Sequence, residues 1–179
     1  MDMHKLVTSA FKQTFFESHN TLLVGGREEP FYQAHRETEP ALICYREDYV
    51  SSALHEIAHW CIAGPARRLI DDYGYWYEPD GRNTAQQQEF ELVEVKPQAL
   101  EWIFSKSIGL TFRISADNLV SNGLPSIEFS QHVYTQVQTY LTEKMPTRAK
   151  AFVNAIADST SHASWALDPN SYQIDELAL

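Results

Sequence analysis

Residues 50–62 read VSSALHEIAHWCI, and their apolar positions recur at the three- and four-residue spacing of an amphipathic helix. Gly64 and Pro65 follow, which is a common way for a helix to end. His55 and His59 are four residues apart, so they lie one above the other on a single face of this helix. Two imidazoles in that position can bind one cation. The stretch predicts a helix that carries a metal site.

Glu56 completes the His-Glu-x-x-His pattern and is the predicted catalytic residue. It projects about 100° away from His55 around the helix, toward the rim of the same site. From there it can take a proton from metal-bound water or hold a ligand. The pattern is short and also arises by chance in core helices, but histidines in such apolar surroundings need partners for their ring nitrogens. A metal meets that need.

The third metal ligand is expected on another element, and Glu94 is the predicted residue. It lies between two valines in a stretch of helical composition, residues 84–104. A carboxylate in that apolar setting needs a cation or hydrogen-bond donors. Glu91 is nearer the polar start of the helix, so we expect it to be solvated or to support a ligand. Of the other histidines, His132 is the one that can support the site from a neighbouring helix.

The remaining sequence predicts an α+β fold, a single mainly helical domain over residues 1–179 with a small sheet beside the metal helix. Gly25 and Gly26 are expected to form a turn between two strands. Pro97 is expected to kink the helix that contains it. The last dozen residues are polar and are expected to be loosely held. Helices are predicted over residues 4–16, 50–62, 84–104, 127–141 and 146–157; strands over 22–24, 41–45 and 111–114; and an aromatic strand or loop over 74–77 with a turn at 79–81.

The composition of the chain argues against several classes of protein: nucleic-acid binders, membrane proteins and secreted proteins. The chain has 24 acidic and 14 basic residues, a net charge of −10, which repels phosphate backbones and argues against direct nucleic-acid binding. No apolar run approaches the ~18 residues of a membrane span, and residues 1–12 lack the apolar core of a signal peptide. Cys44 and Cys61, both in apolar surroundings, are expected to be buried thiols. We predict a cytoplasmic protein without a membrane anchor.

Two histidines and one carboxylate leave two chemistries open. With zinc, the open position holds an activated water, and Glu56 is the general base of a metallopeptidase. With iron, the vacant positions admit dioxygen and a substrate. The ligand spacing alone favours zinc, because His-Glu-x-x-His is much commoner there.

Three longer stretches carry a family resemblance: ALHEIAHWCIAG at residues 53–64, YGYWYEPDGR at 73–82 and FELVEVKPQALEW at 90–102. Together with Glu29-Pro30 and residues 117–119, they closely resemble the bacterial elongation factor P hydroxylase family, from about residue 10 to 155. The resemblance implies a hydroxylase that inserts oxygen at the C5 carbon of a lysine of elongation factor P, after that lysine has received a β-lysyl group.

The ligands that the resemblance implies are His55, His59 and Glu94, with Fe(II) as the expected metal and dioxygen as a co-substrate. An acidic chain with aromatic residues at 75–77 can attract a long cationic side chain by charge and by cation–π contact, although such aromatics more often pack in a core. A zinc peptidase remains the alternative, and a metal-stabilised module that binds a translation protein without catalysis is a third hypothesis.

Overall fold

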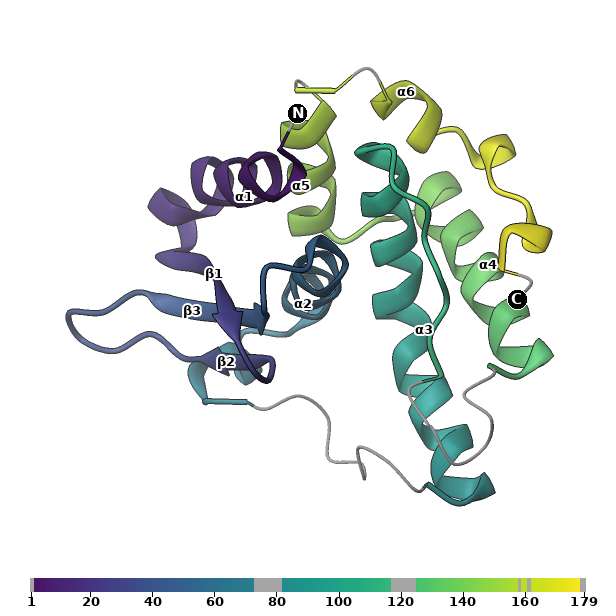
Figure 1. Ribbon diagram of the computed structural model, residues 1–179, viewed down its shortest axis with the longest axis horizontal. Coiled ribbons are helices and arrows are strands. Elements are labelled where there is room, and N and C mark those ends of the chain that lie inside the picture. Colours follow the sequence, from purple (N-terminus) through teal and green to yellow (C-terminus); the bar gives the residue numbers. More distant parts are fainter. Residues whose placement is uncertain (1, 73–81, 117–124, 158, 161, 178–179) are drawn as a thin grey trace.

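A small sheet lies beside a group of helices in the computed structural model, which describes residues 2–72, 82–116, 125–157, 159–160 and 162–177 (Figure 1). The predicted α+β class, mainly helical with a small sheet, is confirmed. The helices are α1 (Met3–His19), α2 (Val50–Ile62), α3 (Thr84–Ser107), α4 (Ile127–Thr142), α5 (Thr147–Ala157) and α6 (Ala163–Ala166); the strands are β1 (Thr21–Arg27), β2 (Phe31–Gln33) and β3 (Ala41–Arg46); and the short 3-10 turns are η1 (Arg67–Leu69), η3 (Pro169–Ser171) and η4 (Ile174–Leu177).

The sheet has the order β1-β3-β2, with β1 parallel and β2 antiparallel to β3. The turn predicted at Gly25 and Gly26 is wrong, because β1 continues through both glycines with a shift of register after Val24. A Cβ atom on Gly25 would lie 2.6 Å from Oδ1 of Asp48, and Gly26 has a φ of 74°. Gly25 is needed because the chain that follows β3 closes directly onto β1, and Gly26 because its backbone is in the left-handed region.

Helix α2 has the predicted bounds and packs between the sheet and α3 (Figure 1). Its inner face carries Leu54, Ile57 and Ala58, which are fully buried. Helix α3 continues through Pro97, and all of its residues from there to Ser107 are buried. Two helices held face to face by a shared core therefore set the distance between any side chains that they present to each other.

The C-terminal end of α2 is fixed by a cation from another helix. Arg148 on α5 donates from Nη2 to the carbonyl oxygens of Trp60, Cys61 and Ala63, at 2.9, 3.1 and 2.6 Å. These carbonyls have no partner inside the helix, and a guanidinium is favoured at the negative end of the helix dipole. Arg148 therefore ties the helix of the paired histidines to the helical half of the molecule.

The strand predicted at residues 111–114 is not formed. The side-chain amide of Gln98 takes the place of a strand neighbour for the end of this segment. Its Nε2 donates to the carbonyl oxygen of Ser115 at 2.8 Å, and its Oε1 accepts from the backbone N–H of Ser115 at 3.0 Å. The segment runs back along α3 and becomes a wall of the region next to α2 (Figure 1).

The expectation of a loosely held C-terminus is also wrong, because Tyr172 is fully buried and packs edge-on against Trp102. Both cysteines are buried free thiols, as predicted. Among the described residues, no helix combines the length and the apolar character that crossing a bilayer requires. The features predicted at residues 74–77, 79–81 and 117–119 lie outside the described residues.

Candidate metal centre

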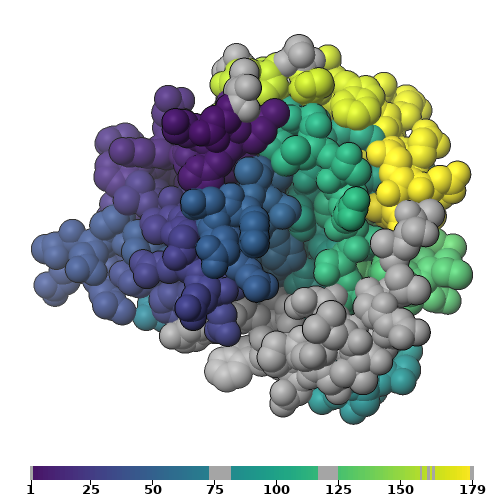
Figure 2. All heavy atoms as spheres, viewed as in Figure 1, coloured from purple at the N-terminus to yellow at the C-terminus, as the bar shows by residue number. Residues whose placement is uncertain are grey.

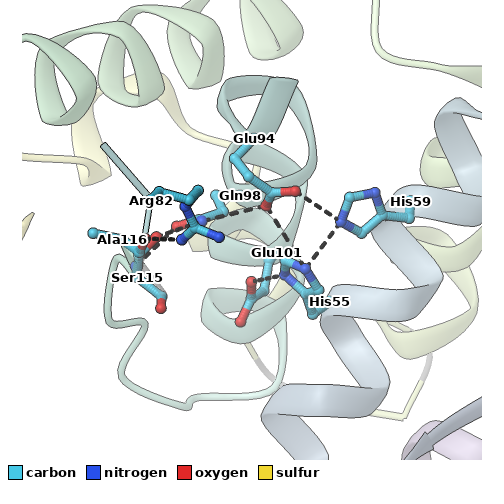
Figure 3. Close-up of polar contacts among 8 residues, drawn as sticks. All are labelled: His55, His59, Arg82, Glu94, Gln98, Glu101, Ser115 and Ala116. Carbon is cyan, nitrogen blue, oxygen red and sulfur yellow. Dashed lines mark hydrogen bonds and ion pairs between the residues drawn. The ribbon is translucent and has the colours of Figure 1, made fainter. Parts of the chain in front are cut away.

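Three side chains from two helices converge at the face between α2 and α3 (Figure 3). Nε2 of His55 lies 2.9 Å from Nε2 of His59. The two oxygens of Glu94 lie 3.3 Å from Nε2 of His59 and 3.7 Å from Nε2 of His55. One atom from each residue lies within 4.8 Å of the other two. The structure thus brings together the three residues that the sequence singled out as ligands.

The chemistry of these atoms fits a divalent cation. Glu94 is only 1% exposed, and its buried Oε1 has no hydrogen-bond donor. A buried carboxylate oxygen without a donor is costly unless a cation faces it. Two imidazole nitrogens at 2.9 Å repel each other unless a proton or a metal lies between their lone pairs. Two imidazoles and one carboxylate are a ligand set that zinc and iron both accept.

Glu101, which the sequence analysis missed, fixes the orientation of His55. Nδ1 of His55 donates to Oε2 of Glu101 at 2.8 Å, and the Glu101 side chain is 12% exposed (Figure 3). This bond directs the other ring nitrogen, Nε2, toward Glu94 and His59. The signal was present in the sequence, because Glu101 follows Glu94 by seven residues, two turns along the same face of α3.

His132 does not support the site: it is exposed on α4 and does not line the cavity described below. Glu91 is neither solvated nor directed at the histidines. It accepts from Oγ of Ser126 at 2.6 Å and from the backbone N–H of the same residue at 3.3 Å, just before α4 begins. Glu91 therefore secures the start of α4, while Gln98 supports Glu94 by donating to its Oε2 at 3.3 Å.

The charges of the cluster shift the pKa values of His55 and Glu94 in opposite directions. Burial alone would lower the pKa of His55, but the hydrogen bond and charge of Glu101, with the other nearby carboxylates, outweigh it and raise that pKa to about 10. Burial alone would raise the pKa of Glu94, but the two histidines and Gln98 outweigh it and lower that pKa to about 2. The cluster thus holds its carboxylate ionised over the whole neutral range.

A cavity of about 1210 Å³ opens over the cluster, bounded by α2, α3, the β2–β3 side of the sheet and the segment after α3. Glu56 lines this cavity beside the histidines. Burial raises the pKa of Glu56, and within the described part of the chain its carboxylate has no hydrogen bond or ion pair. The cavity is large enough for a long side chain, and Glu56 is a carboxylate placed to meet one.

Two histidines on one helix and a glutamate on a second, all lining an open cavity, form an arrangement compatible with a two-histidine, one-carboxylate metal centre. The chain matches the family described as Elongation factor P hydroxylase over residues 10–169. It is 47% identical over 156 residues to the Elongation factor P lysine hydroxylase of Haemophilus influenzae, covering 86% of this chain and 88% of that protein. The chain belongs to the elongation factor P hydroxylase family, as the resemblance in its sequence predicted.

Proposed function

We propose that this protein is a metal-dependent hydroxylase that acts on a lysine side chain of elongation factor P. The family match and the name of its Haemophilus relative support this activity. The observation that carries the proposal is the convergence of His55, His59 and Glu94 at the base of a cavity. The whole of residues 1–179 is proposed to act as one domain, and a translation factor as substrate would place the reaction in the cytoplasm.

His55, His59 and Glu94 are the residues proposed to hold the metal. Fe(II) is the metal proposed, since it supplies the dioxygen chemistry that an unreactive C–H bond requires. The surrounding residues orient these ligands. Glu101 keeps Nε2 of His55 directed at the centre, and Gln98 keeps the carboxylate of Glu94 in place.

Glu56 is the proposed catalytic residue that contacts the substrate side of the centre. Its carboxylate lines the cavity without a partner in the described chain, so it can receive a proton or hold an ammonium group. A substrate side chain that enters the cavity would displace water from the centre, and one that carries the β-lysyl extension fills more of the cavity than lysine alone. We therefore propose the β-lysylated lysine as the substrate.

The proposal is tested in cells. Elongation factor P purified from cells with this protein should carry one additional oxygen atom on the modified lysine, as measured by peptide mass spectrometry. The oxygen should be absent from cells that lack the protein, and it should return with the wild type and fail to return with His55→Ala. Full hydroxylation in cells that lack the protein would refute the proposed function.

A further inference from the structure

Four arginines line the cavity over the metal centre, and within the described part of the chain no lysine does. Arg46 ends β3, Arg67 and Arg68 lie on η1, and Arg113 belongs to the segment after α3. Strand β3 and η1 lie on the sheet side of α2, whereas the segment after α3 lies on the other side (Figure 1). In the space-filling view, the blue residues of β3 and α2 and the teal residues after α3 share one face (Figure 2). The arginines therefore come from elements on both sides of α2 rather than from a single element.

Three of these guanidinium groups have no acidic partner within the described residues. Arg46 and Arg113 are exposed, and neither forms a side-chain hydrogen bond or an ion pair with another described residue. Arg68 is half-buried, and its Nη1 is buried without an acceptor. Of the four, Arg67 alone pairs with a carboxylate in the described part of the chain: its Nη2 donates to Oδ2 of Asp72 at 2.6 Å. A guanidinium that no protein acceptor engages can bind an incoming carboxylate in place of water.

The charges of the cavity lining differ in their distance from the metal cluster. Three of its acids belong to or adjoin the cluster: Glu94, Glu101 and the half-buried Glu56. The other two are Glu29, which is exposed, and Asp72, which pairs with Arg67, so outside the cluster the arginines of the lining exceed the acids by 4 − 2 = 2 charges. This local excess of positive charge lies on a chain with a net charge of −10. A surface of the opposite sign to the whole molecule is unexpected by composition and points to a partner.

We propose that Arg46, Arg67, Arg68 and Arg113, here called the arginine rim, dock an acidic protein surface that surrounds the target lysine. The inference rests on the proposed function and adds the kind of surface that presents the substrate. A cationic side chain would pass the rim and reach the acidic base, while carboxylates around it contact the arginines. Arginine suits this role because its planar group binds carboxylates through two parallel hydrogen bonds. The alternation of charge fixes the orientation of the partner.

The arginine rim also changes the kind of partner that the net charge of the chain would suggest. A net charge of −10 would repel an acidic partner and attract a basic one at long range. The acids that can attract a cation are gathered at the metal cluster, whereas the arginines elsewhere in the lining can attract anions. Binding of the whole partner is then governed by the rim, and placement of the side chain by the base.

The test compares two double variants of equal charge. Arg46→Glu with Arg113→Glu reverses two exposed rim charges, and Lys144→Glu with Lys150→Glu reverses two exposed charges that do not line the cavity. Each has a net charge of −10 − 4 = −14. Affinity for β-lysylated elongation factor P is measured without dioxygen, so that no turnover occurs. We expect the dissociation constant to rise about tenfold for the rim variant and little for the control, with the difference shrinking as salt is added.

Equal weakening by the two variants, or tighter binding by the rim variant, would overturn the docking proposal. Thermal melting checks that both variants are folded, and Arg46→Gln with Arg113→Gln gives a milder pair for which weaker binding is also expected. Different results would refute the docking proposal and the proposed function. If the wild type hydroxylates the factor but the rim variant binds like the control, only the arginine rim is wrong. If the wild type does not hydroxylate the factor, the proposed function is wrong whatever the variants bind.

Discussion

Replacing Glu101 tests whether the centre depends on residues beyond its three predicted ligands. Glu101→Ala removes the carboxylate that accepts from Nδ1 of His55 at 2.8 Å, and it leaves the other contacts of the cluster in place. His55 then loses the bond that sets its tautomer and its ring orientation. Removing such a partner from a metal-binding histidine typically lowers metal affinity by about 10- to 100-fold. That range corresponds to about 1.4–2.7 kcal/mol of binding free energy.

The burial of Glu101 places the expected effect toward the upper part of that range, because its side chain is only 12% exposed and water cannot readily replace it. Glu101→Gln keeps an oxygen that can accept from Nδ1 but removes the charge, so we expect a smaller loss. The assay is competition for Fe(II) or Zn²⁺ against a chromophoric chelator at neutral pH. Glu89 is exposed on the same helix, and Glu89→Ala and Glu89→Gln are matched controls.

The reasoning is refuted if Glu101→Ala binds metal as tightly as Glu89→Ala. A different result would change the assignment: if Glu101→Gln loses metal as completely as His59→Ala, Glu101 is itself a ligand rather than a support for His55. Because these assays measure metal binding and not turnover, their results do not depend on which substrate the protein acts on.

Three further predictions follow from the cluster. Glu94→Ala should abolish metal binding, whereas Glu91→Ala should retain the metal and lose about 1–2 kcal/mol of stability in chemical denaturation, since it only deprives Ser126 of its acceptor; the reverse pattern would contradict the ligand assignment. Glu56→Gln should keep the metal and reduce turnover, and loss of bound metal in this variant would argue against its assigned place. The pKa of His55 is raised from 6.5 to about 10, so in the metal-free protein its stabilising contribution is complete below pH 6.5 and is lost as pH rises toward 10. Metal affinity measured across that window should rise with pH, because the metal displaces this proton, and an affinity independent of pH would refute the coupling.

The sequence predicted the metal helix to the residue because three local signals agree there. The apolar spacing of residues 50–62, the pair of histidines and the Gly64-Pro65 end all require the same helix. Glu94 was predicted as well, from the two valines beside it in the sequence, although Val93 is 39% exposed and the buried face around Glu94 carries Gln98 and Glu101. These are properties of single segments and do not depend on the rest of the fold.

The features that were missed depend on contacts between segments. Glu101 contacts His55 only because α3 packs on α2 in one register. The chain at Ser115 does not join a sheet because Gln98, seventeen residues earlier, satisfies its backbone. Gly25 resembles a turn residue, yet it lies within a strand because Asp48 approaches too closely for a side chain. No local pattern reports such approaches between distant residues.

The central claim is that the cluster of His55, His59 and Glu94 supports hydroxylation of elongation factor P. Its most direct test is intact-mass analysis of β-lysylated and unmodified factor, each incubated with iron-loaded protein, dioxygen and a reductant. The account predicts a gain of one oxygen atom on the β-lysylated factor, little on the unmodified factor or on free lysine, and none with His55→Ala. Cleavage of the factor by the zinc-loaded protein with no gain of oxygen by the iron-loaded protein would contradict it.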